Sequence, residues 1–116
     1  MTQPRLDDYL RHIVAAIERI EQYVTDFDIA RFVEDERTQD AVIRNIEIIG
    51  EASHWIETGF PDFVAAHPEL PVSSAYQMRN AVAHGYFEVD LEIVWKTVKG
   101  DLPALAALIR KLLAEA

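Results

Sequence analysis

An apolar stripe near the start of the chain is the feature that most constrains its fold. Apolar residues recur there at alternating spacings of four and three: Leu6, Leu10, Ile13, Ile17, Ile20 and Val24. This spacing follows the turn of an α-helix, so these side chains line one face. The stripe predicts an amphipathic helix over about residues 4–25 whose apolar face is buried in a core.

A second helix is expected over about residues 39–58, with Thr38 as its N-cap. Gly50 lies in the middle of this helix. Because glycine costs about 1 kcal/mol relative to alanine within a helix, Gly50 suggests that another backbone passes close to it. Residues 26–38 mix acids and bases with little periodicity, and they could form a loop or a short helical turn.

The residues after position 58 contain further signals for the starts and ends of helices. A single helical turn is expected around residues 62–66. A third helix should begin near Ser73 or Ser74, either of which can cap it, and run to His84. Gly85 would then end this helix.

The last part of the chain predicts a further helical segment. Asp90 is expected to cap a fourth helix that runs through Lys99, and Asp101 with Pro103 should restart or kink it toward Leu113. No strand alternation or internal repeat is evident in the sequence. The patterns together predict an all-α bundle of about four to five helices.

Length and charge limit the classes of function. A chain of 116 residues, half of them apolar, predicts one domain over residues 1–116. The formal net charge of −9 speaks against a broad phosphate-tracking surface and does not favour an anionic membrane. The chain has no cysteine and carries Asp7 and Asp8 where a secretion signal would be basic and then apolar, so we expect it in the cytoplasm.

Polar side chains with complementary chemistry gather between residues 79 and 86. Arg79 offers a planar fork that matches phosphate oxygens, His84 can move a proton near neutral pH, and Tyr86 supplies a hydroxyl group. Asn80 shares a helix face with His84, so its amide could orient the imidazole or contact a substrate. These residues predict a site for a phosphate ester.

Helix geometry separates Arg79 from His84. Five residues at about 100° each place the two positions about 140° apart around one helix axis. Either the helix unwinds near Gly85, or two copies of the chain pair and supply side chains to a shared cleft. We favour the second arrangement.

Other polar residues lie on the second predicted helix. Arg44, Glu47 and Glu51 are spaced by three and four residues, which fits exposed ion pairs or the lining of a cleft or dimer contact. Glu51 and His54 have the Glu-x-x-His spacing of di-iron bundles, but that fold needs a second such pair, which this sequence lacks. We therefore expect no metal site.

The same residues resemble a known superfamily. Arg-x4-His is the signature of the HEPN superfamily of helical nucleases, and Arg79-x4-His84-x-Tyr86 resembles its HepT toxin branch. The run from Arg44 to Ala52 looks like the second-helix block of that branch. The likeness continues to about Leu105.

The resemblance implies the toxin of a type VII-like toxin-antitoxin system: a homodimeric, metal-independent endoribonuclease that acts on tRNA or mRNA. In a composite dimer cleft, His84 would transfer protons, Arg79 would hold the phosphate and Asn80 would assist. The implied partner is an MntA-like minimal nucleotidyltransferase antitoxin, which would adenylylate Tyr86. No cofactor, membrane or DNA partner is expected.

Simpler interpretations stand beside this one. A noncatalytic HEPN module that binds a nucleotidyltransferase is the alternative function, because a net charge of −9 is awkward for a free ribonuclease. Arg79 and His84 could instead complement a helix dipole, and Tyr86 could pack at a helix end. Trp55 and Trp95 are most simply expected in the core or at a dimer contact.

Overall fold

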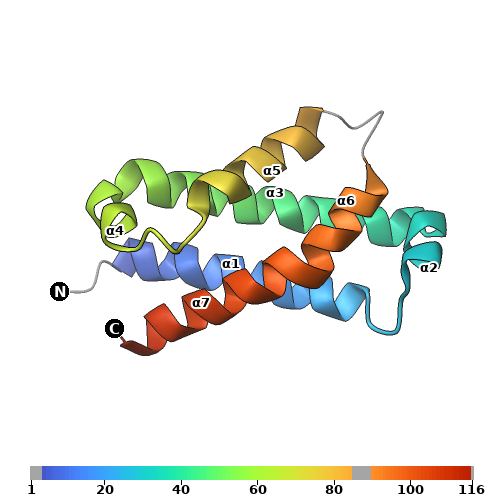
Figure 1. The fold of residues 1–116 in the computed structure, drawn as a ribbon, viewed down its shortest axis with the longest axis horizontal. Coiled ribbons are helices and arrows are strands. Elements are labelled where there is room, and N and C mark those ends of the chain that lie inside the picture. The colour runs from blue at the N-terminus through green and yellow to red at the C-terminus, as the bar shows by residue number, and fades with distance from the viewer. Residues whose placement is uncertain (1–3, 85–89, 116) are drawn as a thin grey trace.

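The computed structural model describes residues 4–84 and 90–115, with the backbone alone at residues 4 and 81–84. All regular structure in these ranges is helical (Figure 1), which confirms the predicted all-α fold. A π-helical turn, Thr97–Asp101, joins the last two helices. The α-helices are α1 Pro4–Tyr23, α2 Ile29–Glu34, α3 Glu36–Gly59, α4 Pro61–Ala66, α5 Val72–His84, α6 Leu91–Lys96 and α7 Leu102–Glu115.

The core lies between α1, α3 and α7. The predicted stripe is buried along its whole length, from Leu6 on α1 to Val24, which directly follows the end of that helix. It packs on α3 and α7, whose buried side chains include Ile49 and Ile109. Figure 1 shows α1 and α3 side by side, with α5 lying on the other side of α3. The long helices therefore form a bundle in which α3 is central.

The segment before α3 contains a short helix that the sequence left undecided. Helix α2 is capped by Asp28, whose carboxylate accepts a hydrogen bond of 2.8 Å from the backbone N–H of Arg31. Phe32 is its buried side chain. The prediction of Thr38 as the cap of α3 is wrong: Asp35 is the N-cap, and Thr38 donates its N–H to that carboxylate at 3.0 Å. Asp35 directly precedes the first helical residue, so its carboxylate can accept hydrogen bonds from the N–H groups of the first turn, whereas Thr38 lies inside that turn.

Gly50 brings α5 against α3, as the sequence predicted. A Cβ atom at Gly50 would lie 3.2 Å from the carbonyl oxygen of Ala75 and 2.7 Å from Cγ of Arg79. It would also overlap Cβ of Arg79. The two helices approach this closely only because position 50 has no side chain.

Helix α5 begins one residue earlier than the expected caps. Ser73 and Ser74 are therefore within its first turn, and their prediction as N-caps is wrong. The hydroxyl of Ser73 instead donates a hydrogen bond to the carboxylate of Glu57 on α3. Gly85, the expected stop, lies outside the described residues.

The C-terminal segment is one helical path with a change of geometry. Asp90 caps α6, as predicted, and accepts hydrogen bonds from the N–H groups of Glu92 and Ile93 at 3.0 and 3.3 Å. The α-helix ends at Lys96, before the predicted Lys99, and the π-helical turn leads into α7. Pro103 lacks the N–H that a continuous α-helix would need at this point, which favours the wider turn just before it. No helix among the described residues is long and apolar enough to cross a membrane.

Candidate active site

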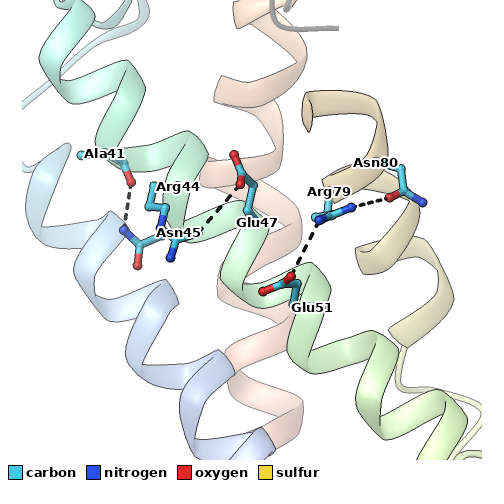
Figure 2. A network of polar contacts seen from close by, with 7 residues as sticks. All are labelled: Ala41, Arg44, Asn45, Glu47, Glu51, Arg79 and Asn80. Carbon is cyan, nitrogen blue, oxygen red and sulfur yellow. Dashed lines mark hydrogen bonds and ion pairs between the residues drawn. The ribbon is translucent and has the colours of Figure 1, made fainter. Parts of the chain in front are cut away.

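Arg79 extends from α5 across the surface of α3. Its Cβ and Cγ atoms lie over Gly50, so the closely packed helix pair fixes the base of the side chain. At the head, Nη1 donates a hydrogen bond of 3.0 Å to Oδ1 of Asn80, and Nη2 lies 3.7 Å from Oε1 of Glu51 (Figure 2). The structure therefore brings three of the predicted site residues together: Arg79, Asn80 and Glu51.

The ion pair between Arg79 and Glu51 is weak. A separation of 3.7 Å is an ion pair that is longer than a hydrogen bond, and the Glu51 side chain is 58% exposed. Such exposed pairs contribute about 0–1 kcal/mol to stability. The Nε atom of Arg79 is buried and has no hydrogen-bond partner among the described residues. A phosphate oxygen that approached Nη2 would compete with a weakly held carboxylate.

Helix α5 is continuous from Val72 to His84. Arg79 and His84 therefore occupy positions about 140° apart on one helix, whereas Asn80 and His84 share a face. The backbone does not unwind between Arg79 and His84. The side chain of His84 and all of Tyr86 lie outside the described residues, so their predicted roles stay predictions.

Arg44 and Glu47 form a separate pair on α3. Their side chains lie 3.9 Å apart, and that of Arg44 is 67% exposed. Among the described residues, no hydrogen bond or ion pair joins this pair to Arg79, and Figure 2 shows the Arg44–Glu47 pair to the left of the Arg79–Glu51 pair. Of the three polar residues predicted on this helix, Glu51 alone contacts Arg79.

Asn45 is a buried polar residue that the sequence analysis did not single out. Its Oδ1 accepts a hydrogen bond of 2.8 Å from Nε of Arg19 on α1, and its Nδ2 donates to the carbonyl of Ala41 at 2.9 Å. It lies among the apolar positions of α3, on the side that faces α1. In the sequence, the signal for this buried polar contact was an asparagine among the apolar positions of the helix. The hydrogen bond from Arg19 to Asn45 joins α1 to α3.

Three aromatic rings lie about one helical turn from the Arg79 contact along α3 and α5: those of His54, Trp55 and Tyr76. The His54 ring stacks on Tyr76 of α5, with centroids 4.2 Å apart. Trp55 is 56% exposed, which excludes the core from the two places expected for it and leaves the dimer contact as a prediction. Trp95, in contrast, is half-buried, and its ring centroid lies 5.3 Å from that of Phe32.

No group of three or more His, Asp or Glu side chains within the described residues could hold a metal ion.

A cavity of about 410 Å³ lies on another side of α5, toward α7. Its walls are mostly apolar and include Ile49, Met78 and Leu105. Arg79, Asn80 and Glu51 do not line it. The candidate site is thus an exposed surface of the α3/α5 pair and not this cavity.

The model of the family described as "Ribonuclease HepT-like" matches this chain over residues 13–112. The chain belongs to the HepT-like ribonuclease family. The match includes α3 and α5, which carry every residue of the candidate site described above.

Individual relatives agree with the family match. A Thermococcus cleftensis protein named "Probable ribonuclease HepT" is 46% identical over 105 residues, which cover 90% of this chain and 93% of the relative. A candidate RNase of Caldanaerobacter subterraneus subsp. tengcongensis is 31% identical over 113 residues, or 97% and 96% of the two chains.

A third relative is a longer protein than this chain. A Methanocaldococcus jannaschii protein, named as a gamma-glutamylcyclotransferase and candidate RNase, is 40% identical over 107 residues. The match covers 92% of this HepT-like chain but 47% of that protein. No solved structure matches the chain.

Proposed function

We propose that this HepT-like protein is an endoribonuclease that works as a homodimer, with Arg79 and His84 of two protomers in one cleft. The observation that carries the proposal is the Arg79 side chain, whose base is fixed against Gly50 while its head is held by Asn80 at Nη1 and has a weak, exposed carboxylate partner at Nη2. A rigid cation with an accessible edge suits recognition of a phosphate. Because the chain belongs to a ribonuclease family, the phosphate that Arg79 would bind is one of the RNA backbone.

The proposed reaction uses the RNA's own 2′-hydroxyl group. His84 removes the proton of the 2′-hydroxyl while its oxygen attacks the adjacent phosphorus, and the bond from phosphorus to the 5′-oxygen breaks. The leaving 5′-oxygen takes up a proton from water, and a cyclic phosphate remains on the other fragment. Arg79 stabilises the negative charge that develops on the phosphoryl oxygens, and Asn80 orients the guanidinium through the hydrogen bond to Nη1. This mechanism requires no metal ion.

The course of α5 supports the use of two protomers. Because the helix is continuous through both positions, Arg79 and His84 diverge on one protomer. A two-fold pair can bring one α5 to face the other, so that each phosphate meets side chains from both copies. The composite cleft is therefore the arrangement that this helix favours.

We further propose that the protein is the toxin of a toxin-antitoxin pair. Its partner would be a minimal nucleotidyltransferase antitoxin that transfers AMP to Tyr86. An AMP group close in sequence to Arg79 would bring a negative phosphodiester to the anion site and repel RNA. One modification would thereby prevent cleavage.

The test is cleavage of cellular RNA by the purified protein in the presence of a metal chelator, together with growth after induced expression. Wild-type protein should cut RNA and arrest growth, and His84→Ala should do neither while it keeps the helical content of the wild type. Coexpression with the nucleotidyltransferase should add AMP mass to wild-type protein but not to Tyr86→Phe. Absence of both cleavage and growth arrest would favour the noncatalytic HEPN module, for which the net charge of −9 is the supporting observation.

A further inference from the structure

The aromatic rings near Arg79 form one cluster across two helices. His54 on α3 and Tyr76 on α5 stack with an angle of 21° between their planes. The centroid of the Trp55 ring lies 6.0 Å from that of His54, and the two planes are inclined by 56°. His54 and Tyr76 are half-buried, whereas Trp55 is 56% exposed. The stacked pair thus supports a tryptophan whose surface faces solvent.

This cluster lies one helical turn from the Arg79 contact on both helices. Trp55 follows Glu51 by four residues on α3, and Tyr76 precedes Arg79 by three on α5. One turn of helix is about 5.4 Å, so the backbone positions that carry the rings lie about that far along the helices from those that carry the Arg79 contact. A nucleic acid strand whose phosphate binds Arg79 can therefore place a neighbouring base on the rings.

The surroundings of Trp55 favour a base over a protein partner. Its neighbours along the exposed side of α3 are Glu51, Thr58 and Gly59, which are all exposed and not apolar. A stable protein interface needs about 800 Å² of surface on each partner, with an apolar centre. The other large exposed apolar side chains among the described residues lie on α1, α2 and α6: Tyr23, Ile29, Val33 and Ile93. A single exposed ring with polar neighbours and a nearby cation instead matches base stacking in single-stranded RNA sites.

We propose that Trp55, supported by the stacked His54 and Tyr76, is a subsite for one unpaired base of RNA next to the phosphate that Arg79 binds. This inference rests on the ribonuclease function proposed above. It identifies the substrate as single-stranded RNA, because a base in a duplex is already stacked on both faces.

The first experiment compares kinetics on a short single-stranded RNA and on the same RNA with an abasic nucleotide beside the cut. Trp55→Ala should raise KM about tenfold and leave kcat within about twofold, whereas Trp55→Phe should keep most of the affinity. The abasic nucleotide should raise KM for the wild type by a similar factor and add little for Trp55→Ala. Ile93→Ala removes an equally exposed side chain on α6 and should leave KM unchanged.

The second experiment separates this inference from the proposed function. An RNA with a 2′-deoxy group at the cut cannot be cleaved, and its binding should quench tryptophan fluorescence in the wild type but not in Trp55→Phe. If the protein cleaves no RNA, the ribonuclease proposal fails, and the same quenching still decides whether the base subsite exists. Cleavage with unchanged KM in Trp55→Ala, or an unquenched Trp55, would overturn the subsite. A smaller assembly for Trp55→Ala in light scattering would also overturn it and assign Trp55 to a contact between copies.

Discussion

The Cβ and Cγ atoms of Arg79 occupy the space that a side chain on Gly50 would need. This relationship joins the fold to the site, because the close approach of α3 and α5 also sets where the guanidinium lies. The head of Arg79 then reaches Glu51 and Asn80 from a fixed base. The geometry of the candidate site therefore depends on Gly50, a residue without a side chain.

We expect Gly50→Ala to lower stability and RNA cleavage together. Alanine in a helix is favoured by about 1 kcal/mol over glycine, but the new methyl group meets Arg79 and the backbone of Ala75, and such overpacking costs about 1–3 kcal/mol. The net result should be a loss of up to about 2 kcal/mol, measured by urea unfolding. Gly59→Ala is the matched control, since a Cβ at that position would meet no atom within 4 Å apart from its chain neighbours and the backbone of its own helix. A more stable Gly50→Ala protein would contradict the proposed packing.

We expect Glu51→Gln to bind RNA about twofold to fivefold more tightly than the wild type. The substitution removes a negative charge 3.7 Å from Nη2 of Arg79, which would otherwise compete with phosphate. Folding stability should change by less than about 1 kcal/mol, because the Glu51 carboxylate is exposed and its contact with Arg79 is long. Glu47→Gln, whose pair with Arg44 is separate, should leave RNA affinity closer to that of the wild type. If Glu51→Gln instead abolished cleavage in a folded protein, Glu51 would be needed to position Arg79.

The Asp35 cap predicts a pH dependence of stability at acidic pH. The hydrogen bond from the backbone N–H of Thr38 holds the pKa of the Asp35 carboxyl below its ordinary value. A lowered pKa in the folded state means that the ionised carboxylate stabilises the fold above the unfolded pKa of about 3.9, and that this contribution is lost as the pH falls through the folded value.

Melting temperatures of the wild type and Asp35→Asn should therefore differ most near neutral pH and converge as the pH falls through the lowered pKa of the folded state. Asparagine still caps a helix, so the comparison isolates the charge. Asp40→Asn, on the exposed side of α3 beyond the cap, should change the melting temperature less at pH 7. A difference between the wild type and Asp35→Asn that is constant with pH would count against the cap.

The sequence predicted the features of this structure that follow from the spacing of apolar residues or from the free-energy cost of a single residue in a helix. The stripe of α1 required a buried face, and a glycine at position 50 implied a close neighbour because its cost must be offset. The cap of α3 was assigned to Thr38 because the hydroxyl begins the periodic segment, but the carboxylate of Asp35 lies at the position that accepts from the first turn. Helix α2 has six residues, too few for periodicity to reveal.

Contacts between helices were beyond the reach of sequence patterns. The stacking of His54 on Tyr76 joins positions 22 residues apart on α3 and α5, and no spacing rule relates them. The sequence likewise indicated Arg79 and Glu51 as separate site residues and did not predict that they form an ion pair. How Arg79 meets His84 depends on a second protomer, which one chain's periodicity does not describe.

Arg79→Lys separates the structural role of this side chain from its role toward phosphate. Lysine keeps an aliphatic base that can pack over Gly50, and it keeps the positive charge near the end of α5, so folding should be preserved. It loses the planar fork, and a single ammonium cannot both bond Asn80 and bind a phosphate in two places. We expect RNA cleavage to fall about 100-fold or more, with a melting temperature close to that of the wild type. Full activity in Arg79→Lys would show that charge alone suffices, and an unfolded protein would assign Arg79 to the fold and not to the reaction.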